Sequence, residues 1–142
     1  MRKVGLGLGI GLRIINGTGK PVSVGTLIAP VLSGSANQTV PSVAFDIDLD
    51  GTAAVDDVIS GQYSTSADFS GATAFSDTLD LSEVGALQVI ITISDLTAGT
   101  YYFRAKHTRA TPAAQSDWSN TLTVTMAAAS GTAPLFMMLT AA

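Results

Sequence analysis

The chain contains no cysteine, so disulfide bonds and thiolate metal sites are excluded from its 142 residues. Charge is also scarce, because charged side chains make up 13% of the sequence, about half of the ~25% usual in a soluble domain. No apolar run approaches the roughly 18 residues of a membrane-spanning helix, so we expect no membrane span. The single histidine, His107, has no nucleophile motif near it, and Gly-x-Ser-x-Gly is absent. The sequence therefore predicts a non-enzymatic protein without catalytic residues or a cofactor.

Apolar residues make up 46% of the chain, which suffices for the core of one domain with short extensions. Several short segments alternate between apolar and polar residues, and no useful helical period is present. We expect six or seven strands, including 43–49, 58–64, 87–93, 101–105 and 121–125, in a β-sandwich. The expected core residues are Phe45, Tyr63, Leu87, Val89, Ile91, Leu96, Phe103, Leu122 and Val124.

Two further side chains have a predicted position relative to this core. Trp118 is expected to cover one end of the core rather than fill its centre. His107 is expected to be an exposed or partly packed residue of the strand that begins at Tyr101. On that strand Tyr101 and Phe103 should face inward, because they alternate with polar residues.

A family resemblance is carried by residues 95–126. There a leucine and a Gly-Thr pair precede an aromatic strand that starts at Tyr101, and the segment 61–70 adds an upstream match. This order resembles the last hairpin and the third strand of a fibronectin type III domain. The resemblance covers about residues 29–126 and implies an all-β, immunoglobulin-like sandwich. It also implies a tyrosine corner at Tyr101 or Tyr102, of which the inward facing of the strand favours Tyr101.

The sequence departs from the family pattern in three places. Phe45 stands where many members carry a tryptophan, and Ala98 replaces the usual proline before the Gly-Thr pair. The spacing from Gly99 to the aromatic residues is one residue short, which leaves the choice between Tyr101 and Tyr102. The fold carries many unrelated functions, so function has to be argued from the segments outside the domain.

Residues 1–28 are expected to form an extended arm and a hinge. Apolar residues alternate with glycines over residues 4–12, so one side of the strand is apolar and the other is bare backbone. Such a strand is stable mainly where another surface approaches it closely. A signal peptide is the competing interpretation, because Arg2 and Lys3 precede a short apolar stretch. Arg13 interrupts that stretch and no Ala-x-Ala site follows closely, so we interpret the segment as an arm.

Residues 127–142 are expected to form a linker and an apolar C-terminal tail. The tail contains five consecutive apolar residues, 135–139, and such a segment is an aggregation hazard when left in water. It should therefore either return to its own domain as a strand or enter a groove on another chain.

Charge is distributed unevenly between the arm and the domain. Every acid except Asp117 lies between Asp46 and Asp95, a range that contains no base, and the early residues contain bases but no acid. The arm could therefore bind the acidic body of another copy of the chain. A solvated terminus beside a solvated face is the alternative. The early bases are Arg2, Lys3, Arg13 and Lys20.

One segment has the spacing of a calcium loop. Carboxylates at this spacing can converge on a hard cation when a glycine lets the backbone reverse. Two of the acids belong to the strand alternation, which should project them into solvent. We therefore interpret the match as accidental and expect no metal site, with a calcium site as the alternative. The residues concerned are Asp46, Asp48, Asp50, Gly51 and Asp57.

Three bases near the C-terminal end of the domain form a small cluster, consisting of Arg104, Lys106 and Arg109. The cluster lacks the broad positive field that phosphate binding needs, so we expect no nucleic-acid partner.

The favoured interpretation is a structural or assembly subunit of a virus particle. Small fibronectin-like domains with glycine-rich N-terminal arms resemble capsid decoration, head-fibre and tail accessory proteins of tailed bacteriophages. We expect a location in the virion, with residues 1–15 and 134–142 docking on other virion subunits and on copies of the chain itself.

The alternative is a bacterial cell-surface or secreted adhesion module. It would bind carbohydrate, such as a host-surface glycan, and calcium would be an optional stabilising ion. It would use the loop at Asp46 and the aromatic residues Tyr63, Phe69 and Trp118. A third interpretation, an enzyme, has no supporting set of residues.

Overall fold

The computed structural model describes residues 26–130. The predicted arm, residues 1–15, and the predicted apolar tail, residues 134–142, lie outside the described residues. Within the described range the chain forms strands and one short helix. The elements are β1 (Val31–Ser33), β2 (Asn37–Thr39), β3 (Val43–Asp48), β4 (Val58–Ser64), β5 (Thr73–Thr78), α1 (Leu81–Ala86), β6 (Gln88–Ile93), β7 (Gly99–Arg109), β8 (Ala114–Gln115) and β9 (Leu122–Ala127).

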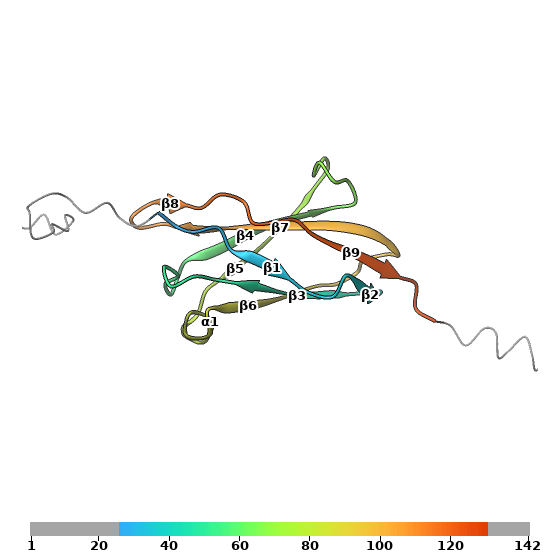
Figure 1. The fold of residues 1–142 in the computed structure, drawn as a ribbon, viewed down its shortest axis with the longest axis horizontal. Helices are drawn as coiled ribbons and strands as arrows, with labels where there is room; N and C mark the ends of the chain where they lie inside the picture. Colours follow the sequence, from blue (N-terminus) through green and yellow to red (C-terminus); the bar gives the residue numbers. More distant parts are fainter. Residues whose placement is uncertain (1–25, 131–142) are drawn as a thin grey trace, which may run out of the picture.

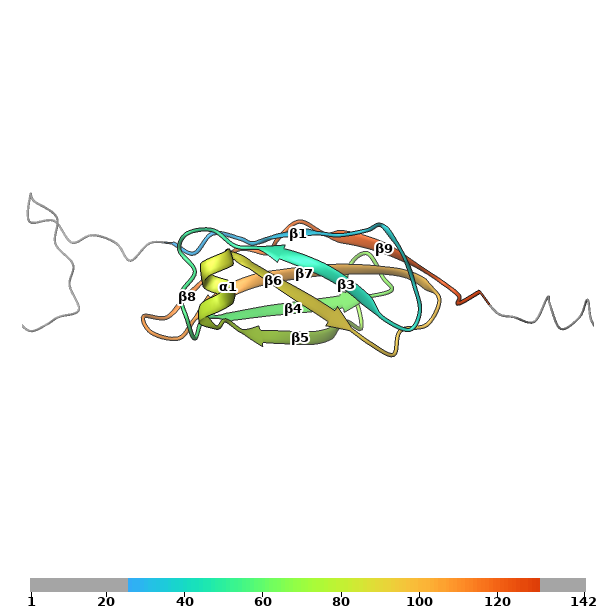
Figure 2. The same cartoon turned by 90° about the horizontal axis from the view of Figure 1, so that it is seen from below.

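The strands form two sheets that pack face to face (Figures 1 and 2). One sheet has the order β1-β3-β6, and the other has the order β2-β9-β7-β4-β5 with β8 paired to β7. Neighbouring strands are antiparallel except for β2 and β9, which are parallel. The fold is therefore an all-β, immunoglobulin-like sandwich. The alternating sequence predicts the sandwich, and the family resemblance implies its immunoglobulin-like type. The two ends of the described range leave the sandwich at opposite ends of its long axis (Figure 1).

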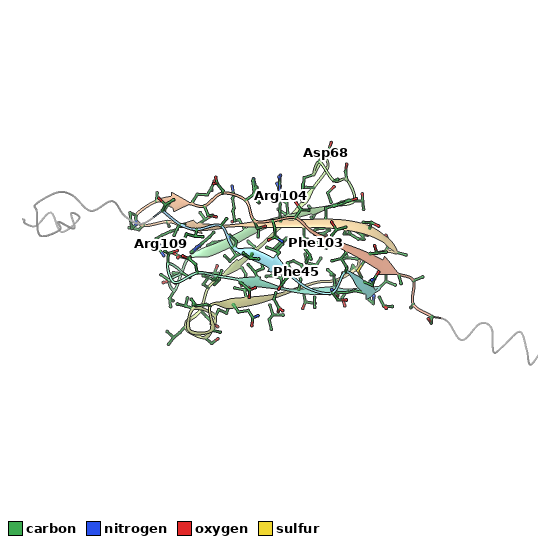
Figure 3. All side chains as sticks on the ribbon, in the orientation of Figure 1. Phe45, Asp68, Phe103, Arg104 and Arg109 are labelled. Atoms are coloured by element: carbon green, nitrogen blue, oxygen red, sulfur yellow. The ribbon has the colours of Figure 1, made fainter. Side chains whose placement is uncertain are left out.

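An aromatic cluster occupies the middle of the sandwich, where Phe45 of β3 faces Phe103 of β7 (Figure 3). Their ring centroids are 5.0 Å apart, and the Tyr63 ring stacks on Phe103 at 5.7 Å. Most of the predicted core is confirmed as buried, namely Phe45, Val89, Ile91, Leu96, Phe103 and Val124. Tyr63 and Leu122 are partly buried against this core.

Gly61 of β4 makes room for the aromatic ring of Phe75, which lies directly opposite it on β5. A Cβ atom placed on Gly61 would lie 2.0 Å from Cζ of Phe75. The ring thus occupies the space of the missing side chain and reaches Phe45, with centroids 5.9 Å apart. Glycine here lets an edge strand contribute an aromatic ring to the core.

Tyr101 closes the corner before β7. Its side chain is buried, and its hydroxyl oxygen accepts the backbone N–H of Thr97 at 3.2 Å. Tyr102 points to the other face of the strand and is half-buried. The preference for Tyr101 over Tyr102 at this corner is confirmed.

The helix α1 was not predicted, and it corrects one core assignment. Asp80 accepts the backbone N–H of Glu83 at 2.9 Å, and Glu83 accepts the N–H of Asp80 at 2.8 Å. This reciprocal capping box starts a helix that ends at Leu87 in the left-handed conformation, with φ 55°. Leu87 is 39% exposed, so its predicted core position is wrong. Within residues 26–130, no helix has both the length and the apolar character to cross a membrane.

Candidate functional site

The segment with calcium-loop spacing does not bring its carboxylates together. Asp48 is exposed on β3, and Asp46 of the same strand is half-buried. Asp50 accepts the hydroxyl of Thr52 at 2.6 Å, whereas Asp57 turns into the interior. Among residues 26–130, no three acidic or histidine side chains form a group that could hold a metal ion.

Asp57 instead belongs to a buried polar network with two residues of β7. Its carboxylate lies 2.8 Å from Nε2 of His107 and accepts Nε of Arg109 at 2.7 Å. The second guanidinium nitrogen of Arg109 donates to Asp57 at 2.5 Å and to the carbonyl of Thr52 at 2.6 Å. The network therefore fixes the loop before β4 to the end of β7, fifty-two positions away in sequence.

His107 is 1% exposed, so its predicted exposed or partly packed position is wrong. The reason is the alternation of β7, which stays regular as far as His107 in a strand that ends at Arg109. Tyr101, Phe103 and His107 fall on the same inward row of this long strand, so its alternation buries the histidine with the aromatic residues.

The hydrogen bonds of this network favour the charged forms of Asp57 and Arg109. Burial raises the pKa of Asp57, but hydrogen bonds from Arg109, from His107 and from the N–H of Ala54 outweigh it, so the pKa is lowered overall. The hydrogen bond to Asp57 in turn raises the pKa of Arg109. Asp57 and His107 are buried, whereas the Arg109 side chain is 17% exposed. The three side chains satisfy one another, and the network holds the end of the sandwich.

A second constellation lies on the outer face of the larger sheet, centred on Arg104 of β7. The guanidinium carbon is 4.0 Å from the ring centroid of Phe69 and 4.3 Å from that of Trp118. The guanidinium also donates twice to Oε1 of Gln62, directly across the strand pair, at 3.2 and 2.9 Å. We call these four residues the arginine stack. Since the guanidinium is held by two rings and an amide, the stack is rigid and pre-organised.

The loop between β4 and β5 positions Phe69 for this contact. Phe69 adopts φ 62°, and its N–H donates to the carbonyl of Ser66 at 3.0 Å. Asp68 accepts the N–H of Ser70 at 2.9 Å and the hydroxyl of Ser66 at 2.8 Å. The pKa of Asp68 is lowered, first by the bond from Ser70 and then by the bond from Ser66. The hydroxyl of Ser64 closes the loop by donating to the carbonyl of Ser70 at 2.8 Å.

Serine side chains hold Trp118 beside β7. Ser119 donates its N–H to the carbonyl of Ala105 at 2.7 Å and accepts the N–H of Ala105 on its hydroxyl at 3.0 Å. Ser116 makes the same pair of bonds with His107, at 2.8 and 2.9 Å. These bonds replace a regular strand ladder and place the indole on the outer face. The prediction that Trp118 covers one end of the core is therefore wrong.

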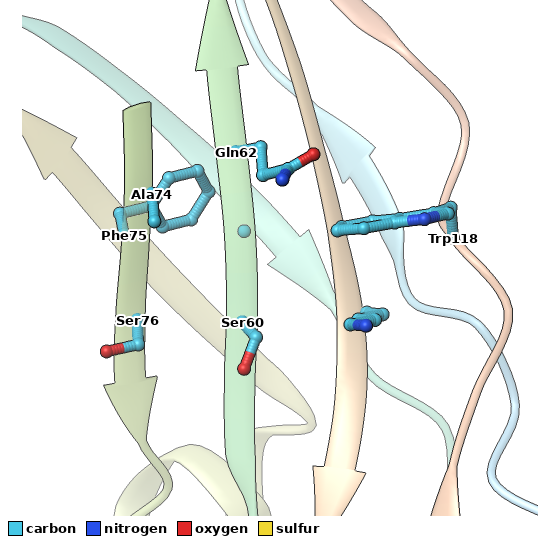
Figure 4. A pocket seen from close by; sticks show the side chains of 8 residues that line it. Ser60, Gln62, Ala74, Phe75, Ser76 and Trp118 are labelled. Carbon is cyan, nitrogen blue, oxygen red and sulfur yellow. The ribbon is translucent and has the colours of Figure 1, made fainter. Parts of the chain in front are cut away.

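Next to the arginine stack, the outer face is hollowed into a shallow depression of about 340 Å³. Figure 4 shows Ser60 and Gln62 of β4 and Ser76 of β5 along its floor, with Trp118 on the other side of β7. The ammonium nitrogen of Lys106 lies 4.8 Å from the Trp118 ring centroid and donates to a side-chain oxygen of Gln115 at 3.1 Å. The depression thus combines hydroxyl, amide, ammonium and indole groups.

The predicted basic cluster is divided between two faces of β7. Arg104 and Lys106 lie on the outer row, whereas Arg109 lies on the inner row and pairs with Asp57. Figure 3 shows Arg109 near one end of the sandwich and Arg104 beside the loop that carries Asp68. Residues 104 and 109 have opposite parity on the strand, so the alternation of β7 places their side chains on opposite faces.

Calcium is expected to leave the melting temperature unchanged when added at millimolar concentration, which thermal denaturation checks. A ligand that binds only the folded state stabilises it, but Asp57 is already engaged by Arg109 and His107. The matched variant Asp50→Ala should behave like the wild type in both conditions. A calcium-dependent rise that disappears in Asp50→Ala would restore the calcium-loop interpretation.

Comparison with known proteins identifies similar folds. No family model and no curated protein matches the chain. Among solved structures, the PKD domain of an M14-like peptidase from Thermoplasmatales archaeon SCGC AB-540-F20 is similar with a TM-score of 0.41 and 19% identity, covering 70% of this chain and 94% of that one. A superoxide reductase (neelaredoxin) from Ignicoccus hospitalis has a TM-score of 0.46 and 6% identity, with coverage of 72% and 82%. Similarity at this level carries no conclusion about the function of this chain.

Proposed function

We propose that the chain is a fibronectin type III-like, non-enzymatic structural subunit of a virus particle, of the tailed-phage type. It would be a capsid decoration, head-fibre or tail accessory protein located in the virion. The order β1-β3-β6 against β9-β7-β4-β5 supports the type III assignment, as does the tyrosine corner formed by Tyr101 and Thr97.

The observation that carries the proposal is the arginine stack. Arginine and large aromatic side chains are enriched at the energetically dominant positions of protein interfaces. Here an arginine and two aromatic rings are already held rigid on an open sheet face. Binding of a partner would therefore cost little of the conformational entropy of these side chains. In the other polar constellation, Asp57 and His107 are buried and the carboxylate is already occupied by His107 and Arg109. The geometry thus supports binding to another macromolecule better than it supports chemistry.

Docking through the terminal segments completes the proposal. Residues 1–15 would contact a neighbouring copy, and residues 134–142 would contact other virion subunits. The described range enters and leaves the sandwich at opposite ends (Figure 1), which favours a chain that links one neighbour on each side. Charge favours the same contact, because the early residues carry bases only, whereas the range from Asp46 to Asp95 carries acids only.

Deletion of residues 1–15 is expected to leave the sandwich folded, with nearly the same melting temperature, while self-association is lost. The core described above involves none of these residues, whereas the proposed contact with a neighbour depends on them. Sedimentation velocity over a range of concentrations, together with thermal denaturation, measures both properties. Exposed ion pairs weaken with salt, so association of the full chain should also decrease at high ionic strength. Unfolding of the truncated chain would make the segment part of its own sandwich.

The virion location has its own test. Mass spectrometry of particles purified from a host that carries the gene should find the chain at a copy number comparable to that of other structural proteins. Its presence only in the culture medium or on the cell surface would refute the virion proposal.

A carbohydrate-binding adhesion module is the second candidate, and the depression beside Trp118 favours it. The half-buried indole of Trp118 lies next to hydroxyl and amide groups. An indole in such a place can pack on the apolar face of a sugar while the polar groups bind its hydroxyls. Of the aromatics expected for this function, Phe69 and Trp118 do lie together, whereas Tyr63 points into the core. Glycan-array binding by the wild type that is lost in Trp118→Ala would favour the adhesion module over the virion subunit.

A further inference from the structure

One edge of the sandwich lacks the features that normally prevent a strand from pairing with another chain. β1 and β2 are edge strands of three residues each, and edge strand β5 carries Asp77 on its inward row, opposite Ile59. Short length and inward charge both discourage edge pairing. β6 has six residues, no charge and no proline. Among the described strands β6 has one neighbour, β3.

The direction of the backbone groups on β6 follows from its ladder with β3. Leu49 donates its N–H to the carbonyl of Leu87 at 2.8 Å, so residues 49 and 87 form a hydrogen-bonded pair. Such pairs alternate with non-hydrogen-bonded pairs along an antiparallel ladder. Residues 89, 91 and 93 therefore bond to β3, and the N–H and carbonyl groups of Gln88, Ile90 and Thr92 point to the open edge.

The open edge is apolar and lies in an acidic setting. Ile90 is 65% exposed, and with Glu83 of α1 it lines a hollow of about 360 Å³ beside the strand. On β3, Asp46 lies opposite Ile90 and Asp48 lies opposite Gln88. The edge therefore offers backbone hydrogen bonds and apolar surface to a strand that carries positive charge.

We propose that the edge of β6 receives residues 2–13 of a second copy as an added strand. The inference rests on the proposed function, because it places the arm of one subunit on the body of another. Arg2, Lys3 and Arg13 flank an uncharged, alternating segment. Its length of about nine alternating residues exceeds the six of β6, so the strand can be covered along its whole edge.

The apolar row and the glycine row of the arm match the inner and the outer face of the sheet at the edge of β6. Val89, Ile91 and Ile93 face the core from β6, and the apolar row of the arm would continue that row between the sheets. The glycine row would then lie beside Ile90 and leave room for its exposed side chain. A second β6 strand is a poorer occupant, because it carries no basic residue to complement Asp46 and Asp48.

Disulfide cross-linking between two singly substituted chains tests the placement. The chain has no cysteine of its own, so every disulfide would come from the introduced residues. Chains carrying Gly5→Cys, Gly7→Cys or Gly9→Cys are mixed one at a time with an Ile90→Cys chain under mild oxidation. We expect one arm position to give a covalent heterodimer, since a disulfide requires Cα atoms within roughly 4.4–6.8 Å. Thr123→Cys on the exposed row of β9 is the control and should give none.

Variants of the edge test the same contact without cross-linking. Thr92→Pro removes an N–H that points away from β3, and proline is tolerated at such an edge position. Ile90→Lys places a positive charge next to the basic residues of the arm and should repel it. This variant provides the test if Thr92→Pro fails to fold. Either is expected to weaken self-association by at least about tenfold, whereas Thr123→Lys should not. Sedimentation velocity of the full chain measures these changes.

The outcomes separate this inference from the proposed function. If deletion of residues 1–15 abolishes self-association but both edge variants associate normally and no arm cysteine reaches position 90, the β6 site is wrong and the proposed arm contact stands. If Gly7→Cys and Ile90→Cys cross-link only within one doubly substituted chain, the arm pairs with its own body and the inference is overturned. If the full chain is a monomer at every concentration, both proposals fail.

Discussion

Replacing Phe103 by alanine is expected to lower the free energy of unfolding by about 3–5 kcal/mol, the usual cost of truncating a buried phenylalanine. The Phe103 side chain is fully buried and contacts the rings of Phe45, Tyr63 and Tyr101. A loss of this size is comparable to the whole stability of a small domain. Urea or guanidinium denaturation, followed by tryptophan fluorescence, measures it.

The exposed position Thr123 provides the control for Phe103. It lies on β9 opposite Tyr102, on the outer row, so Thr123→Ala should change the free energy of unfolding by no more than about 0.5 kcal/mol. Cooperative unfolding of Phe103→Ala at an unchanged denaturant midpoint would contradict the central position assigned to this ring.

Alternation predicted the strands that have one buried and one exposed row. β4 occupies the predicted range, and the inward rows of β3 and β6 follow the sequence pattern, because side chains on a strand point alternately to the two faces. The strand β5 was not predicted, because its inward row contains Phe75 and Asp77 and its other residues are small. The segment therefore lacks a regular alternation of apolar and polar residues. Its burial depends on Gly61 of another strand, which local periodicity does not contain.

The candidate site was less predictable than the fold, because its contacts join distant segments. Phe69 and Trp118 meet at Arg104 only once the loop after β4 and the serine-rich segment beside β7 are in place. The local spacing of Asp57 fits only an accidental calcium-loop match, and its actual partners lie at the end of β7. A signal was present for α1, since Asp80 and Glu83 have the spacing of a capping box.

Replacing Asp57 by alanine is expected to cost about 3–5 kcal/mol at neutral pH, because it removes one partner of a buried ion pair. The change leaves the guanidinium of Arg109 and the ring of His107 without their carboxylate. It also frees the N–H of Ala54, which donates to Asp57 at 3.0 Å. Chemical denaturation at pH 7 measures the cost. Asp68→Ala is the matched control, because Asp68 lies in an exposed loop, and its loss should be smaller.

The stability contributed by Asp57 should depend on pH in a defined direction. The pKa of Asp57 is lowered in the folded protein, so the folded state binds the proton more weakly than the unfolded state does. The contribution is therefore fully present above the ordinary aspartate pKa of about 4 and is lost as the pH falls through the lower folded pKa. The difference in stability between the wild type and Asp57→Ala should shrink between pH 5 and pH 2 (approximate limits). A constant difference across this range would show that Asp57 acts through packing rather than through its charge.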